Sequence, residues 1–108
     1  MRERDVVANR VRIGAGGLTV AFSSDSRTLA TGDEDGKIRL WNASTGAPLS
    51  FTASHDRAVY ALAWTVDNKI LVSGSADKTL RYWNVQTGKQ LARITAHDGA
   101  VRSIVILP

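Results

Sequence analysis

The 108-residue sequence contains no cysteine, and it has only two histidines and two prolines. The absence of cysteine excludes disulfide bonds, thiolate metal sites and cysteine nucleophiles. His55 and His97 lack the companion ligands that a metal site requires, so we expect both to be structural. No pattern in the chain indicates a cofactor.

Long hydrophobic runs are also absent. The longest, AVYALAW, is far shorter than the roughly 20 residues that cross a bilayer, and the charged start MRERDVVANR lacks the apolar centre of a signal peptide. We therefore expect no membrane contact and an intracellular location, in the cytoplasm or the nucleus. With 44% hydrophobic and 22% charged residues, the composition is typical of a soluble globular domain.

The charge balance is moderately basic, with 14 Lys and Arg residues against 10 acidic ones, for a net charge of +4. The basic residues are interspersed with acidic ones and form no long block. A solvated surface explains this distribution better than a phosphate-binding stripe. Nucleic acid stays open as a weakly supported partner.

One stretch of the chain is written twice. DGKIRLWN at residues 35–42 corresponds to DKTLRYWN at residues 77–84. Overlaying residues 18–66 on residues 60–108 without a gap pairs 15 identical residues among 49. The chain therefore contains an internal repeat with a period of 42 residues, and we call its two copies the first and the second repeat.

Each period is predicted to consist of short strands separated by turns. Polar turn sequences such as VDNK, SADK and NVQTGK interrupt the apolar segments, and no segment favours a helix. Along TLRYW, alternation places Leu80 and Tyr82 on one face and Thr79, Arg81 and Trp83 on the other. The strands expected in the second repeat are residues 58–65, 70–74, 79–83 and 90–95.

A 42-residue period of four strands with an early His, a Ser-Gly-Ser-x-Asp-x-Thr turn and a closing Trp-Asn resembles the WD-repeat β-propeller family. The resemblance covers residues 17–108 and implies an all-β fold, a partial β-propeller of four-stranded antiparallel blades. The blades are expected at about 17–54 and 58–96. The inner strand of a third blade is expected at about 100–107, and the degenerate segment 1–16 is expected to supply the outer strand of a preceding blade.

The resemblance also implies a structural tetrad that links a turn to a neighbouring strand through side-chain hydrogen bonds. In the second repeat the matching residues are His55, Ser73, Asp77 and Trp83. In the first repeat they are Thr31, Asp35 and Trp41, whereas Ile13 stands where the histidine belongs. That blade is therefore expected to lack one link. His97 matches the first member of a third tetrad.

Catalytic and ligand-binding alternatives are weaker. His55, Ser73 and Asp77 have the composition of a hydrolytic triad, but no Gly-x-Ser-x-Gly elbow accompanies them. GDEDGK lacks the glutamate of a calcium loop, since Asn42 stands at that position. GAGG precedes a predicted strand rather than a phosphate-binding helix. We therefore expect a protein that is not an enzyme.

The function implied by the resemblance is a protein-interaction scaffold that binds a protein or peptide through the loops of one face. The residues expected on that contact surface are Arg57, Tyr60, Arg102 and Glu34, because Arg and Tyr are enriched at binding hot spots. The alternative is a nucleic-acid- or chromatin-associated propeller module that uses its basic surface.

The number of blades is too small for a closed ring, which usually has four to eight. Two blades alone leave apolar sheet faces and strand edges exposed. We therefore predict that the chain is a fragment of a larger propeller, or that it is completed by self-association or by further blades.

Overall fold

The computed structural model describes residues 5–8, 11–14, 19–95, 99–104 and 106, with only the backbone described for residues 5–14. All regular structure in these ranges is β-strand, which confirms the all-β prediction. Among the described residues, no helix is long and apolar enough to cross a membrane.

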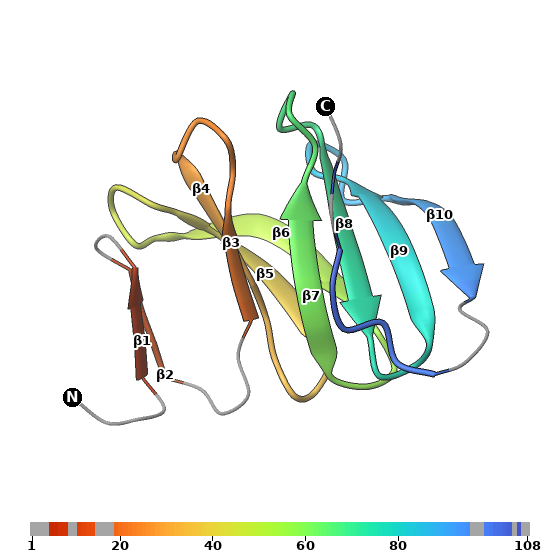
Figure 1. Cartoon of the computed structure of the whole chain (residues 1–108). Helices are drawn as coiled ribbons and strands as arrows, with labels where there is room; N and C mark the ends of the chain where they lie inside the picture. The colour runs from red at the N-terminus through yellow and green to blue at the C-terminus, as the bar shows by residue number, and fades with distance from the viewer. Residues whose placement is uncertain (1–4, 9–10, 15–18, 96–98, 105, 107–108) are drawn as a thin grey trace.

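Two four-stranded antiparallel sheets form the body of the molecule (Figure 1). In each sheet the strands follow one another in chain order, so every strand pairs with its neighbour in the sequence. The first sheet contains β3 (Thr19–Phe22), β4 (Thr28–Gly32), β5 (Lys37–Asn42) and β6 (Pro48–Ser54). The second contains β7 (Val59–Trp64), β8 (Ile70–Ser75), β9 (Thr79–Asn84) and β10 (Gln90–Thr95).

The strands predicted for the second repeat agree with β7 to β10 within one residue at each end. Local turn chemistry explains this agreement. The Asp67 carboxylate accepts a hydrogen bond from the Lys69 amide at 3.0 Å, and Asn68 adopts a positive φ of 62°. The Asn84 side chain accepts bonds from two later amides in the turn between β9 and β10. These polar side chains fix where each strand stops.

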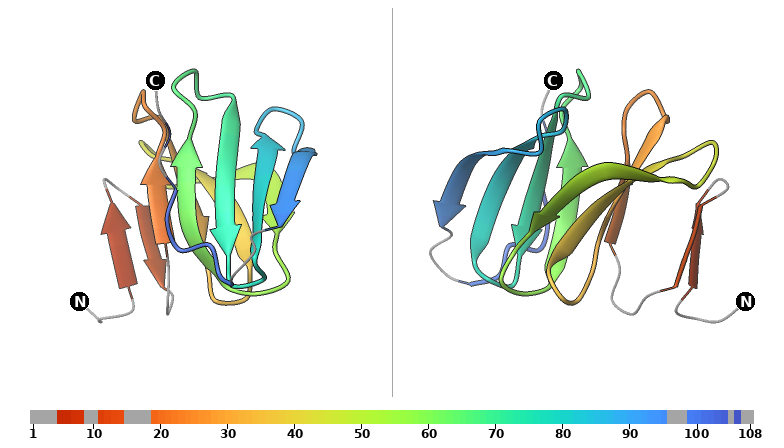
Figure 2. Two further views of the ribbon diagram at one scale, coloured as in Figure 1. Left: turned by 45° about the vertical axis from the view of Figure 1, so that its right-hand side comes forward. Right: turned by 180° about the vertical axis from the view of Figure 1, so that it is seen from behind.

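The two sheets pack face against face and spread apart from adjacent inner strands, β3 and β7, to outer strands β6 and β10 (Figure 2). Alternation along β5 buries Ile38 and Leu40 between the sheets while Lys37 and Arg39 are exposed. The shared core combines Ala30, Ile38, Leu40 and Phe51 of the first sheet with Val59, Leu71 and Trp83 of the second. This core holds the two repeats together.

In each four-stranded sheet, a glycine in the second strand contacts a valine from the segment that follows the sheet. A methyl group on Gly32 would overlap the side chain of Val59, and one on Gly74 would overlap Val101. The backbone matches this correspondence, since the Val59 amide donates to the Asp33 carbonyl and the Val101 amide donates to the Ser75 carbonyl. Residues after Gly99 therefore start on the second sheet as β7 starts on the first.

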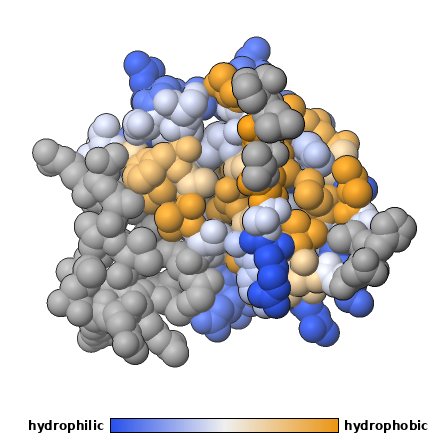
Figure 3. All heavy atoms as spheres, in the orientation of Figure 1, coloured by the Kyte–Doolittle hydropathy of each residue, from blue (hydrophilic) through white to orange (hydrophobic). Residues whose placement is uncertain are grey.

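The outer faces of the sheets expose apolar side chains. Val20 and Phe22 of β3 are 38% and 37% exposed, and Ile94 of β10 is 53% exposed. Ile94 pairs with Leu80 and lies on the face of the second sheet that points away from the first. Figure 3 shows hydrophobic residues gathered at the surface in this view. In the described structure, neither outer face is packed against another four-stranded sheet.

Two segments differ in form from what the sequence suggested. Instead of one outer strand, the N-terminal segment contains two, β1 (Asp5–Ala8) and β2 (Val11–Gly14), which pair antiparallel in a sheet of their own. The described residues of 99–104 and 106 form no strand. A strand requires a partner, and no further segment of the described chain pairs with them. Residues 105, 107 and 108 lie outside the described ranges.

Candidate functional site

The polar residues singled out in the second repeat lie at one buried place. His55 follows β6, at the crossing to the second sheet. Its Nδ1 lies 2.9 Å from Oδ2 of Asp77, and its Nε2 lies 2.6 Å from Oγ of Ser73. Ser73 is fully buried in β8, and Asp77 stands in the turn before β9. The imidazole therefore bridges a turn carboxylate and a strand hydroxyl.

Trp83 completes the chain of hydrogen bonds. Its Nε1–H donates to Oγ of Ser73 at 2.8 Å. Because this hydroxyl accepts from the indole, it is free to donate its own proton to Nε2 of His55, and Nδ1–H then donates to Asp77. The donors and acceptors agree along the whole path with a neutral His55. No buried side-chain nitrogen or oxygen in the described structure lacks a hydrogen-bond partner.

Asp77 is the acceptor at the end of this path. The backbone amides of Thr79 and Asp56 donate to its carboxylate at 2.9 and 3.1 Å. Burial alone would raise the pKa of Asp77, but the hydrogen bonds from Thr79 and His55 outweigh it and hold the pKa well below its usual range. The carboxylate is therefore charged at neutral pH.

Thr79 and Arg81, which were not among the residues predicted for the tetrad, also belong to this network. The Thr79 hydroxyl donates to Asp77 and accepts from Nε–H of Arg81 at 3.1 Å. Arg81 is buried, its Nη2 lies 3.2 Å from the Asp77 carboxylate, and its Nη1–H donates to the Ser54 carbonyl of β6. The alternation along TLRYW is the signal that points to these two residues, since it places Thr79 and Arg81 on the same face as Trp83.

The order Asp77, His55, Ser73 is also that of a catalytic triad, so access to the hydroxyl decides what it can do. Ser73 has no exposed surface, and its Oγ is already held by His55 and by the indole of Trp83. A nucleophile needs an open path to the substrate and donors for the oxyanion. This geometry fits a structural clamp and offers no such path.

The first repeat has a shorter network. Nε1–H of Trp41 donates to Oγ1 of Thr31 at 3.0 Å, as Trp83 does to Ser73. Asp35, however, is exposed and is not joined to this pair. The turn is held instead by Asp33, whose carboxylate accepts from the amides of Asp35 and Lys37 at 2.9 and 3.0 Å. Ile13 cannot bridge an aspartate to a hydroxyl, so the two ends stay separate.

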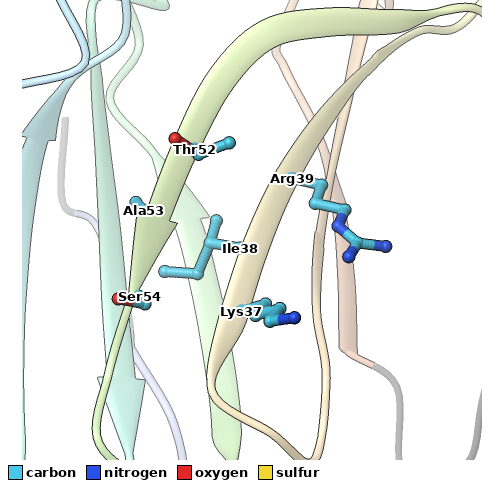
Figure 4. Close-up of a pocket in the computed structure, with 6 residues that line it drawn as sticks. All are labelled: Lys37, Ile38, Arg39, Thr52, Ala53 and Ser54. Carbon is cyan, nitrogen blue, oxygen red and sulfur yellow. The ribbon is translucent and has the colours of Figure 1, made fainter.

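The arginines of the two repeats differ for the same reason. Arg81 is buried against Asp77, whereas the equivalent Arg39 is exposed. Arg39 and Lys37 line a cavity of about 330 Å³ along β5 and β6, and their side chains point away from Ile38 (Figure 4). Thr52, Ala53 and Ser54 complete the lining. The cavity has no histidine or carboxylate in its wall and offers no catalytic group.

The residues expected to contact a partner are all exposed. The guanidinium carbon of Arg102 lies 4.7 Å from the centroid of the Tyr60 ring. Arg57 is close to the same place, because its carbonyl accepts from Oγ of Ser75, and the Ser75 carbonyl accepts from the amide of Val101. Glu34 stands in the turn between β4 and β5, next to Asp33, whose carbonyl is bonded to Val59.

Metal ligands do not gather anywhere in the described ranges, where no group of three or more His, Cys, Asp or Glu could hold an ion. His97, the expected first member of a third tetrad, lies outside the described residues.

Two segments of the chain, residues 14–42 and 46–84, match the family model described as WD domain, G-beta repeat. Together they cover more than half of the sequence. The chain belongs to the WD40 repeat family. The resemblance seen in the sequence is thereby confirmed. Repeats of this family generally serve as non-catalytic scaffolds, and their typical role is protein binding.

Curated relatives match over short stretches. The chain is 43% identical over 44 residues to the periodic tryptophan protein 2 homolog of Dictyostelium discoideum, covering 41% of this chain and 5% of that protein. It is 41% identical over 51 residues to the probable cytosolic iron-sulfur protein assembly protein 1 of Cryptococcus neoformans, covering 42% of this chain and 12% of that protein. The chain thus spans only a small part of the relatives it matches.

Solved structures support the propeller architecture. The computationally designed protein Ika4 has a TM-score of 0.73 and 29% identity, with 84% of this chain and 55% of that chain covered. The β-propeller domain of Myceliophteria thermophila Cps50 (Swd1) has a TM-score of 0.76 and 24% identity, with 84% and 29% covered. The fold is therefore a partial β-propeller, because the two sheets do not close a ring.

The two repeats provide a matched test of the network. Asp77→Ala removes the acceptor of several buried donors, so the free energy of unfolding should fall by about 1 to 3 kcal/mol. Asp35→Ala changes the equivalent but exposed residue and should alter stability by less than about 0.5 kcal/mol. Chemical denaturation of both variants measures the difference. Equal losses in the two would show that the network does not stabilise the second sheet.

Stability should also depend on pH through His55. Burial lowers the pKa of His55, although Asp77 acts to raise it. The unfolded chain therefore binds a proton more readily than the folded one, and the free energy of unfolding should decrease as the pH falls below about 6.5. His55→Gln should remove this part of the slope between about pH 7 and 5. Denaturation of both proteins across that range measures it, and parallel curves would contradict the assignment.

Proposed function

We propose that this chain is a non-catalytic protein-interaction scaffold built from WD repeats. The observation that carries this proposal is the burial of the triad-like group in the second repeat: the Ser73 hydroxyl is enclosed between His55 and Trp83. The loops at the end of the sheets where β7 begins carry exposed side chains, among them Glu34 and Arg57. Recognition through loops on a rigid scaffold is a common use of such folds.

The proposed contact surface consists of Arg57, Tyr60, Arg102 and Glu34. Support comes from their exposure and from the contact between Arg102 and Tyr60, which brings two segments 42 residues apart to one place. Tyr and Arg combine a large contact area with directional hydrogen bonds, which is why they are frequent at the centre of protein interfaces. A protein or peptide is accordingly the proposed partner.

The proposal includes further blades. In a longer stack, an additional sheet would pack on each outer face of the molecule. One outer face carries the exposed residues Val20 and Phe22, and the other carries Ile94. We propose that these faces are covered by further sheets of the same repeat, from a longer chain or from another copy. An intracellular setting, cytoplasmic or nuclear, belongs to the same proposal and draws on the relative named as a cytosolic assembly protein.

Peptide selection tests the contact surface. Peptides recovered from a random library on the wild-type chain should lose affinity by about tenfold or more when Tyr60 or Arg102 is replaced by alanine. Lys69→Ala, in the turn between β7 and β8, is the control and should leave affinity unchanged. Isothermal titration gives the dissociation constants. The same loss for Lys69→Ala as for the surface variants would contradict the proposed surface.

Light scattering after size-exclusion chromatography tests the exposed faces. Because Val20, Phe22 and Ile94 leave apolar surface exposed on the two outer faces, the isolated chain should elute as associated species larger than a monomer. Ile94→Glu should shift the mass distribution towards the monomer, whereas Val66→Glu, at a residue that is 67% exposed in a turn, should not. A monomeric wild type with one sharp unfolding transition would contradict the need for further blades.

A further inference from the structure

The pair formed by Arg102 and Tyr60 has a geometry that a merely solvated arginine does not need. The guanidinium carbon lies 4.7 Å from the ring centroid, within the range of a cation–π contact. The backbone before Arg102 is anchored, since the Val101 amide donates to the Ser75 carbonyl at 2.9 Å and the Val101 side chain fills the space beside Gly74. The guanidinium is thus held in place before any partner arrives.

A guanidinium stacked on an aromatic ring uses its flat face and leaves its N–H edge available. That edge matches a carboxylate, to which two parallel N–H bonds can be donated. Among the described residues, no carboxylate lies within ion-pair distance of Arg102 or of the neighbouring Arg57. Within the described part of the chain, this surface therefore offers two cations that are not paired with a carboxylate.

We propose that this surface binds an acidic peptide segment, with a Glu or Asp carboxylate paired to Arg102 and with Tyr60 supporting the arginine from behind. This inference rests on the proposed scaffold function and specifies the chemistry of its partner. Arg57 provides the second cation, since its carbonyl accepts from Oγ of Ser75 and the Ser75 carbonyl accepts from the amide of Val101. In the first repeat, Leu18 stands at the position that corresponds to Tyr60, so that repeat has no aromatic ring there.

The charges around the pair favour a peptide over a nucleic acid. Glu34 is exposed in the turn before β5, and the side chain of Asp56, adjacent to Arg57, is 86% exposed. These carboxylates repel a continuous phosphate backbone, which needs a broad basic surface. A flexible peptide can place one carboxylate at Arg102 and turn its other charged side chains away from Glu34 and Asp56, which a stiff phosphate backbone cannot do.

Fluorescence anisotropy with labelled hexaglutamate and hexaglutamine peptides tests the proposal on the full chain. Hexaglutamate should bind and hexaglutamine should not. Arg102→Gln should weaken hexaglutamate binding by about tenfold or more, since a charge-assisted bidentate contact is lost. Tyr60→Phe should keep the affinity within about twofold, whereas Tyr60→Leu should weaken it by about threefold because the ring is lost.

Arg27→Gln is the matched control, because it removes the same charge from an exposed residue in the turn between β3 and β4. An equal loss in Arg27→Gln and Arg102→Gln would show that only net charge matters and would overturn the proposal. Displacement of hexaglutamate by a short DNA duplex at far lower concentration than by unlabelled hexaglutamate would also overturn it. Library peptides that depend on Tyr60 but carry no acidic residue would overturn the acidic partner and leave the scaffold function standing.

Discussion

The carboxylate of Asp77 lies where the segment after β6 meets strand β9. It receives hydrogen bonds from the residues after β6, from the first residue of β9 and from Arg81 within that strand. Arg81 also donates to the Ser54 carbonyl, so its guanidinium links the second sheet to β6, the outer strand of the first sheet. The pKa of Asp77 is low because these donors all stabilise its charged form.

The first repeat shows the network without its histidine and its threonine, since Ile13 and Lys37 stand at the positions of His55 and Thr79. With Ile13 at the histidine position, the Trp41 and Thr31 pair persists, but Asp35 and Arg39 face solvent. Two sheets with the same strand order thus have different electrostatic interiors. These replacements leave the turn separate from the strand without altering the strand order, because the apolar core and the turn residues determine that order.

Much of this architecture was predictable, because the repeat, the turn residues and the period-two alternation all agree on the same strands. The sheet of β7 to β10 and the residues around His55 follow from those patterns. The ion pair of Arg81 was less accessible, since an arginine in a strand is usually exposed and only its shared face with Trp83 argued otherwise. In the first repeat, Asp33 and not Asp35 holds the turn, because the Asp33 carboxylate is the one that reaches two backbone amides. The sequence contains both aspartates and does not tell which of them has this geometry. The hairpin of β1 and β2 was missed because the repeat fades there and no spacing remained to locate it.

The glycine and valine that meet between successive sheets have a consequence for how such a molecule can be extended. Gly32 forms a hollow on one side of its sheet, and Val59 forms the matching projection on the next. Gly74 and Val101 repeat the same shapes 42 residues later, so the joint is directional: in both cases the hollow is filled by a valine that follows it in the sequence. Units added to the hollow side and to the projecting side are not interchangeable, so a stack of these sheets has a polarity inherited from the direction of the polypeptide.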